Sequence, residues 1–275
     1  MRKVPLYKDA EKKSYYKFLK EIETVPEKEV KRIKSLKGEP AVAPKFANRA
    51  IIQTEAYEPV PEGVYLMDDG TIFLSAVTPC QNITQEMAEW WMVWHQLDPL
   101  RYALWNPEDH FNVKISEQDR DRFLNKKIPI RERIWGTTSI VTESWNGEDN
   151  PTEGELKFVS PDSVGLKNGL IGTPKCKAII VANNSTKIGP ISYPVMMCEY
   201  IRENSEGKNE WVVTAWMGHG VKDGKDVQMK LPKMLLRKMA SEMPSMFIVH
   251  NHKEIGHLNK ILPKLYAEQK DNWLE

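Results

Sequence analysis

Short runs of alternating hydrophobic and polar residues fill the middle of the chain and predict β-strands. Residues 64–67 and 71–76 read as a hairpin, because the Asp-Gly pair at 69–70 supplies the positive φ angles of a tight turn. Further strands are expected at residues 137–145, 155–159, 176–182, 195–202 and 210–217, each bounded by Gly, Pro, Asn or Asp. This succession predicts an antiparallel sheet.

Helical periodicity dominates both ends of the chain. Residues 232–269 place apolar side chains at intervals of three and four, with interruptions at Pro244 and Pro263. A shorter helix rich in tryptophan is expected at 84–95, and two short helices at about 15–22 and 26–36. A curved antiparallel sheet closed on a long C-terminal helix is an α+β, helix-grip arrangement, and such an arrangement encloses a cavity.

The first forty residues differ from the rest in composition, with twelve Lys/Arg and seven Asp/Glu. We therefore divide the chain into an N-terminal helical element, residues 1–58, and a main domain, residues 59–275. The N-terminal element is either a solvated arm or a dimerisation or lid element, because Tyr15, Tyr16 and Phe18 need something to pack against.

Charge and cysteine content exclude several classes of function. The formal net charge is +1, which gives no electrostatic reason to expect nucleic acid or an anionic membrane as a partner. Cys80, Cys176 and Cys198 are widely spaced and form no CxxC pair, so neither a disulfide framework nor a cysteine zinc site is expected. The chain also lacks an apolar run of 18 residues. A cytoplasmic location is expected.

A possible metal-binding pair lies in the C-terminal helical pattern. His250 and Glu254 are four residues apart, so both lie on one helix face and can share an ion. The same spacing also occurs in surface salt bridges. The apolar neighbours Phe247, Ile248 and Ile255 indicate that this stretch is buried, where polar groups need partners.

A second notable region, residues 90–110, is unusually aromatic and ends in a histidine, His110. Its tryptophans can form ordinary core, a flat apolar wall for an aromatic ligand, or both. Glu108 or Asp109 could orient an imidazole as an outer partner, although a solvated turn explains them equally.

The run WWxxWHxxxxxRYxxWxPxDH at residues 90–110, with the later HxxxE pair, resembles the family of 2,4-diacetylphloroglucinol hydrolase and phloretin hydrolase. The resemblance implies a START-like helix-grip domain, an N-terminal dimerisation element and hence a homodimer. It also implies a zinc ion bound by His110, His250, Glu254 and a further carboxylate. Glu143, on the strand 139–143, matches that carboxylate by approximate spacing, with Glu132 and Glu153 as competitors.

The resemblance also suggests catalytic residues. Tyr102 occupies the position of a tyrosine eight residues before the first ligand and is expected to contact a substrate hydroxyl. The family has a further histidine on a later strand, but residues 197–200 contain none. The general acid is therefore left open among His219, Glu199 and Tyr200.

The implied activity is hydrolysis of the carbon–carbon bond between the ring and the acyl group of an acylphloroglucinol. Phloretin is the expected substrate, cleaved to phloroglucinol and 3-(4-hydroxyphenyl)propanoate, with zinc activating water and no organic cofactor. Its bulky arm requires an apolar pocket, for which the candidates are Trp90, Trp94, Met196, Met197, Trp216 and Phe247.

Three alternatives stay open at this point. The substrate could be 2,4-diacetylphloroglucinol, whose acetyl arm needs less space. The chain could be a non-catalytic START-like carrier of hydrophobic ligands, in which the same polar residues only satisfy one another. A zinc hydrolase of amides or esters is compatible with the ligands but not favoured by the aromatic motif.

Overall fold

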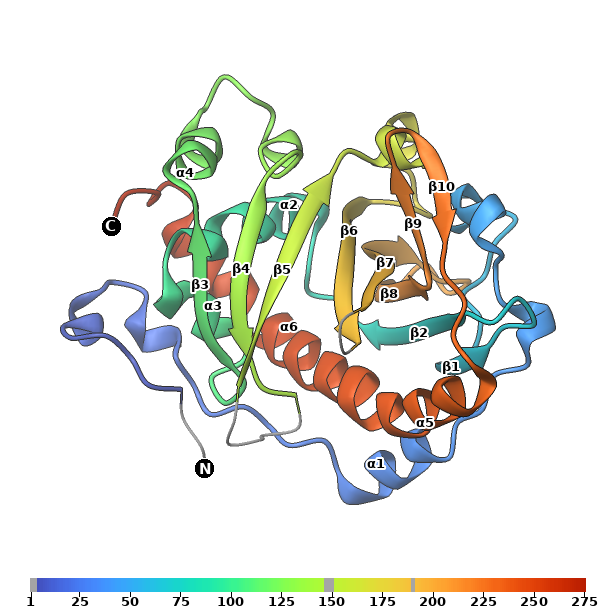
Figure 1. Cartoon of the computed structure of the whole chain (residues 1–275). Helices are drawn as coiled ribbons and strands as arrows, with labels where there is room; N and C mark the ends of the chain where they lie inside the picture. The colour runs from blue at the N-terminus through green and yellow to red at the C-terminus, as the bar shows by residue number, and fades with distance from the viewer. Residues whose placement is uncertain (1–3, 146–150, 189–190) are drawn as a thin grey trace.

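The computed structural model describes residues 4–145, 151–188 and 191–275, and its main element is an eight-stranded antiparallel sheet (Figure 1). The strands are β1 Gly63–Leu66, β2 Ile72–Pro79, β3 His110–Ile115, β4 Thr138–Glu143, β5 Thr152–Val159, β6 Ala178–Ile188, β7 Ile191–Glu203 and β8 Asn209–Met217. Their order across the sheet is β1-β2-β8-β7-β6-β5-β4-β3. A separate hairpin pairs β9 His219–Lys222 with β10 Lys225–Gln228.

The C-terminal part of the chain forms the long helix that the sheet surrounds. The α-helices are α1 Glu27–Lys34, α2 Gln85–Trp94, α3 Pro99–Trp105, α4 Glu117–Leu124, α5 Lys233–Met243 and α6 Val249–Gln269. A π-helical segment, Pro244–Ile248, joins α5 to α6. In Figure 1 the strands curve around α6, and α6 packs against β2, α2 and α3. The predicted α+β helix-grip arrangement, a curved antiparallel sheet closed on a long C-terminal helix, is confirmed.

The sheet has a weak seam between β5 and β6. Among the described residues these strands pair only at Phe158↔Ala182 and Val159↔Val181, whereas β6 and β7 pair over eleven positions. Figure 1 shows β5 and β6 diverging away from this contact. The seam therefore separates β3, β4 and β5 from the rest of the sheet.

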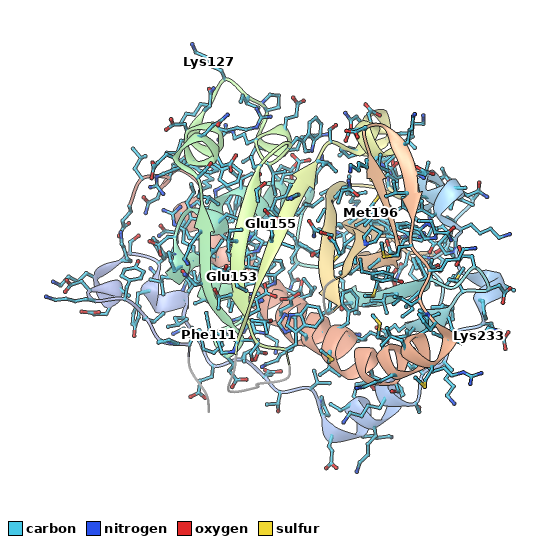
Figure 2. All side chains as sticks on the ribbon, viewed as in Figure 1. Phe111, Lys127, Glu153, Glu155, Met196 and Lys233 are labelled. Carbon is cyan, nitrogen blue, oxygen red and sulfur yellow. The ribbon has the colours of Figure 1, made fainter. Side chains whose placement is uncertain are left out.

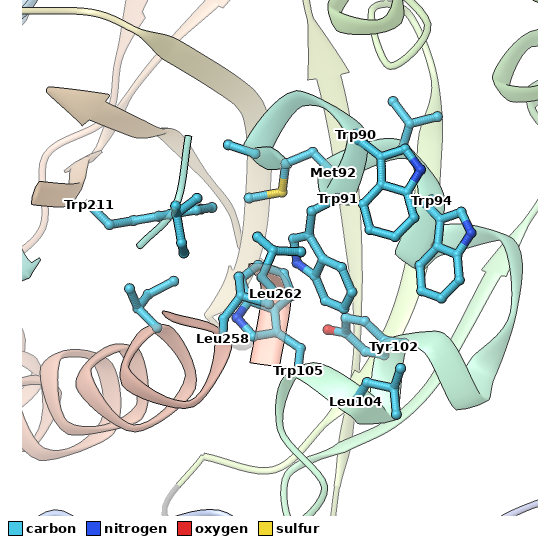
Figure 3. Close-up of a cluster of buried hydrophobic side chains, with 14 of the residues drawn as sticks. Trp90, Trp91, Met92, Trp94, Tyr102, Leu104, Trp105, Trp211, Leu258 and Leu262 are labelled. Atoms are coloured by element: carbon cyan, nitrogen blue, oxygen red, sulfur yellow. The ribbon is translucent and has the colours of Figure 1, made fainter. Parts of the chain in front are cut away.

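Side-chain alternation on β7 separates two buried layers. Met197 packs against the core that contains α2, α3 and α6, whereas Cys198 and Tyr200 belong to a second cluster on the other face of the sheet. The first core contains most of the tryptophans, several of which are seen together in Figure 3. A one-residue step along β7 therefore decides whether a side chain faces α6 or faces away from it.

Side-chain caps position the two helices that carry the aromatic motif. The Thr84 hydroxyl accepts a hydrogen bond from the Met87 amide at the start of α2, at 3.3 Å. Asp98 accepts one from the Leu100 amide at the start of α3, at 2.8 Å, with Pro99 at the first helical position. These caps fix where each helix begins, and α3 in turn places Tyr102.

All the predicted strands are present, and so are the helices at 84–95 and 26–36. The helix expected near 15–22 is only a 3₁₀ turn, Tyr16–Phe18, because its aromatic residues pack individually into the core rather than along one helix face. Pro263 does not interrupt α6, since burial of Leu262 and Leu265 holds the helix through Gln269. The elements α3, β3, α4 and the β9–β10 hairpin were not predicted.

The N-terminal segment packs against the main core. Tyr15 and Ile33 are fully buried there, and Tyr15 meets Trp94 edge to face at 5.2 Å. The boundary between residues 58 and 59 stays a prediction. No helix within the described ranges is long and apolar enough to cross a membrane.

Candidate metal centre and active-site cavity

The sheet brings two of the predicted ligands together at one end of β3 and β4. His110 is the first residue of β3 and Glu143 the last of β4, and the two are direct partners in the antiparallel register. Directly paired residues project from the same face of a sheet. His110 Nε2 lies 3.9 Å from Glu143 Oε1.

Helix α6 supplies the other two ligands from one turn. His250 and Glu254 project towards the same point, with His250 Nε2 at 3.2 Å from Glu254 Oε2. The same carboxylate oxygen lies 3.2 Å from His110 Nε2, and the two Nε2 atoms are 3.4 Å apart. Ligand atoms of His110, Glu143 and His250 all lie within 4.8 Å of one another. The structure thus brings together all four predicted ligands.

This arrangement fits a divalent cation. The Nε2 atoms of His110 and His250 face each other beside the carboxylates of Glu143 and Glu254. A positive charge at this point would interact favourably with all four groups. Burial disfavours a charged His250, but Glu254, Asp109 and Glu143 outweigh burial and raise its pKa to about 10. Burial raises the pKa of Glu254, but His250 and His110 outweigh burial and lower this pKa to about 2. Imidazole and carboxylate are suitable ligands for zinc and related ions.

Neighbouring polar groups hold the ligands in place. Trp145 Nε1 donates a hydrogen bond to Glu143 Oε2 at 3.1 Å, and the Tyr102 hydroxyl donates to Glu143 Oε1. Asp109 Oδ2 lies 3.7 Å from His250 Nδ1 and accepts a hydrogen bond from Lys253 at 2.9 Å. Of the two acids considered for orienting an imidazole, Asp109 therefore lies beside His250, and Glu108 is paired with Lys253 at 2.6 Å.

The two competing carboxylates lie outside the cluster. Glu153 pairs in register with Thr142, so it projects from the opposite face to Glu143, is exposed and lies 3.7 Å from Lys114. Figure 2 labels it on β5. Glu132 ends the 3₁₀ turn Ile130–Glu132 near α4. Glu143 is the carboxylate that the fold places beside the two histidines.

A cavity of about 130 Å³ opens beside the four residues, between the sheet and α6. Its apolar wall comes from both sides of the seam and from the π-helical segment, and includes Val141, Leu156, Phe158, Ile180, Met197 and Phe247. The four candidate ligands and Tyr102 form the polar end. The cavity can therefore hold a molecule with one polar and one apolar half.

Only two of the six residues expected to line an apolar pocket do so, namely Met197 and Phe247. Trp90 and Trp94 stack on each other at 4.6 Å within the core around α2, on a helix face turned away from the cavity. Met196 and Trp216 belong to the cluster on the other face of the sheet, because strand alternation points them there. For these four residues the expectation was wrong.

Two of the predicted catalytic residues lie in the cavity. The Tyr102 ring stacks on His110 at 4.3 Å and 8°. Glu199, on β7, accepts a hydrogen bond from Trp211 Nε1 at 3.2 Å. Burial raises the pKa of Glu199 to about 8, and the nearby Glu254 adds to this effect. Burial thus favours the protonated form of the Glu199 carboxyl group.

The other two predicted catalytic residues lie elsewhere. Tyr200 follows Glu199 directly, so it projects from the opposite face of β7 and packs in the second cluster. His219, on β9, stacks on Phe46 at 4.8 Å, with Nε2 at 3.2 Å from Asp69. Neither is among the described residues that line the cavity.

Sequence reasoning missed three further polar residues of the cavity, namely His95 and Gln96, directly after α2, and Asn251 on α6. His95 is buried between Trp91 and Tyr102, with ring centroids at 5.2 Å and 5.7 Å. Its position inside the aromatic motif was the available signal, but a histidine in an aromatic run does not by itself show which way it points.

Comparison with known proteins shows the family of the chain. The model of the DAPG hydrolase PhiG domain family matches residues 42–267. Phloretin hydrolase of Eubacterium ramulus is 27% identical over 98% of this chain and 96% of its own, and a 2,4-diacetylphloroglucinol hydrolase of a Pseudomonas species is 26% identical over 67% and 63%. Among solved structures, norcoclaurine synthase of Thalictrum flavum covers 72% of this chain and 89% of its own at 10% identity, with a TM-score of 0.38. Since the family model spans most of the sequence, the chain belongs to the DAPG hydrolase family.

Proposed function

We propose that this protein hydrolyses the carbon–carbon bond between the ring and the acyl group of an acylphloroglucinol, with zinc at the four-residue centre. Its family is one of carbon–carbon bond hydrolases. One observation carries the proposal for this chain, namely that His110, Glu143, His250 and Glu254 converge at the polar end of a cavity with a long apolar wall. Phloretin is the proposed substrate, and phloroglucinol and 3-(4-hydroxyphenyl)propanoate are the products.

The donor set supports zinc among the divalent ions. Two imidazoles and two carboxylates suit it, and zinc can add a fifth position for water or substrate. When bound, it would supply an activated water and stabilise negative charge on the acyl oxygen. His110, Glu143, His250 and Glu254 would hold the ion, and Asp109 would help to orient His250.

Tyr102 and Glu199 are proposed to act on the ring. The Tyr102 hydroxyl lies at the metal centre, where it can contact a ring hydroxyl. Hydrolysis adds hydroxide to the acyl carbon and leaves the bonding electron pair on the ring carbon, which must take up a proton. Glu199 lines the cavity and has a raised pKa, so it can donate that proton. His219 and Tyr200, the alternatives, lie outside the cavity.

The apolar wall favours phloretin over 2,4-diacetylphloroglucinol. Side chains of β4, β5, β6, β7 and the π-helical segment line it, which is more apolar surface than an acetyl group would cover. The relative named phloretin hydrolase also matches nearly the whole chain. Turnover of the two compounds side by side, with products separated by chromatography, tests this preference. Faster turnover of 2,4-diacetylphloroglucinol would reverse it.

The second candidate function is a carrier of hydrophobic ligands, which the apolar cavity alone would support. A carrier purifies without stoichiometric metal, keeps its ligand after chelation and releases no product. An enzyme loses turnover on chelation and regains it with added zinc. Elemental analysis of the purified protein together with a phloretin turnover assay therefore separates the two functions.

Assembly and location form the last part of the proposal. We propose a cytoplasmic homodimer that associates through residues 1–58. Analytical ultracentrifugation of the whole chain tests the dimer, and a purely monomeric sedimentation profile would overturn it.

A further inference from the structure

His95 is a buried histidine of the cavity that the proposed reaction does not use. It follows α2, is 5% exposed and lines the cavity with Tyr102 and His110. Its ring stacks on Tyr102, which in turn stacks on His110, so three parallel rings lead from the cavity wall to the metal centre. Trp105 meets its ring edge to face at 5.2 Å. These contacts fix the orientation of the imidazole.

The hydrogen bond of His95 determines which ring nitrogen carries the proton. Nδ1 lies 2.6 Å from the backbone carbonyl oxygen of Trp91, and a carbonyl oxygen can only accept. Nδ1 therefore donates, and Nε2 has no proton when the ring is neutral. Burial lowers the pKa of His95 to about 3, so the ring is neutral throughout the physiological range.

Nε2 is thus a fixed hydrogen-bond acceptor, and among the described residues the Trp91 carbonyl, which contacts Nδ1, is the only hydrogen-bond partner of the ring. Because His95 lines the cavity, a ligand that fills the cavity shields this acceptor from water, and a hydroxyl group on the ligand would satisfy it. The apolar side chains of the cavity supply no such donor. The phenolic hydroxyls of a phloroglucinol ring are donors of the required kind.

We propose that His95 Nε2 accepts a hydrogen bond from a ring hydroxyl of the bound substrate, which makes His95 a residue that selects for the trihydroxylated ring. This inference rests on the proposed function for the class of ring that is bound. It adds a way to distinguish phloroglucinol from rings that carry one hydroxyl fewer. A site with a fixed acceptor rejects such a ring because the acceptor is left unpaired.

Two substitutions separate the acceptor from the rest of the side chain. In His95→Asn the amide nitrogen can replace Nδ1 and donate to the Trp91 carbonyl, but nothing replaces Nε2. In His95→Gln the longer side chain carries an amide group to the Nε2 position, so an acceptor is available again. His257→Gln is the matched control, because His257 is also buried with an unpartnered Nε2 but does not line the cavity.

The test is equilibrium binding of phloroglucinol and resorcinol, measured by calorimetry on the zinc-loaded protein and each variant. We expect the wild-type protein to prefer phloroglucinol by about tenfold or more. His95→Asn should lose most of that preference, His95→Gln should retain part of it, and His257→Gln should keep it in full. Thermal unfolding of each variant shows that the fold is kept.

Two results would overturn the proposal. One is a wild-type protein that binds both rings equally or binds neither, and the other is a folded His95→Asn variant with the wild-type preference. A separate assay of acylphloroglucinol turnover distinguishes this failure from that of the proposed function. If the protein turns over acylphloroglucinols and His95→Asn keeps the wild-type ring preference, only the proposed role of His95 is ruled out. If the wild-type protein prefers phloroglucinol but shows no turnover, only the hydrolase activity is ruled out.

Discussion

Glu254 lies close to both histidines of the proposed metal centre, since one of its oxygens is 3.2 Å from Nε2 of His110 and of His250. Replacing it with Gln keeps the shape of the side chain and removes the negative charge. We expect Glu254→Gln to lose bound zinc and to reduce turnover at least a hundredfold, because a ligand contributes more than the outer partners, which are typically worth 10- to 100-fold.

Metal content by elemental analysis and product formation by chromatography check this prediction. Glu153→Gln is the control, because Glu153 is exposed on the neighbouring strand and projects away from the centre. Full zinc occupancy and turnover in Glu254→Gln would remove Glu254 from the site.

Glu199 should give the reaction its pH dependence on the alkaline side. Its pKa is raised to about 8, so the carboxyl group can donate a proton below that pH and loses it above. We expect kcat to fall as pH rises through about 8, and Glu199→Gln to be much slower without this fall. Rates measured between about pH 6 and 10 test the assignment. An unchanged alkaline fall in the variant would assign it to another group.

The candidate metal ligands could be singled out from the sequence more readily than the residues around them. His110, His250 and Glu254 stand in a motif, so they could be proposed as ligands without coordinates. The sequence did not decide between Glu199 and Tyr200 as the general acid. Adjacent residues of a strand face opposite sides of the sheet, and only the folded structure shows which side holds the cavity. The same applies to His95, whose role depends on the Trp91 carbonyl that fixes its proton.

Among the elements, α3 has the most direct effect on the site because it carries Tyr102. Asp98 caps it and also accepts a hydrogen bond from Tyr7 at 2.9 Å. We expect Asp98→Ala to lower the free energy of unfolding by about 1 kcal/mol. Urea denaturation measures the loss. The control is Asp121→Ala, an exposed position in α4, which should change stability by less than about 0.5 kcal/mol. Equal stability of the two variants would show that the cap contributes nothing.

Prediction of elements succeeded where periodicity was clear, and in α3 it failed because burial is nearly uniform. The alternating strands and the long C-terminal helix were predicted because one face of each is apolar. Helix α3 was not, since six of its seven residues are buried and no polar face marks it as a helix. Strand β3 lacks a strong alternating pattern, because only His110 and Val113 of its six residues are buried.

In the whole molecule, the proposed metal centre joins strands β3 and β4 to helix α6. His110 and Glu143 belong to strands β3 and β4 on one side, and α6 supplies the other two ligands. Removal of the ion should therefore loosen β3, β4 and β5 more than β7 and β8. Hydrogen exchange with and without a chelator tests this, with faster exchange expected in the first group alone. A uniform increase over the entire sheet would contradict it.

The helix-grip architecture followed from the order of the elements, but the seam did not. The local sequence indicates that β5 and β6 are strands. It does not indicate how many residues of β5 pair with residues of β6. That number depends on the side chains of β4, β5, β6 and α6 around the cavity, which meet only in the folded chain.

The short contact between β5 and β6 has a consequence for enzyme engineering. Substitutions near Phe158 and Ala182 can alter the width of the cavity while every metal ligand stays in place. Directed evolution towards bulkier or smaller acyl groups should accordingly select substitutions in these two strands, while the residues that carry out the reaction stay unchanged.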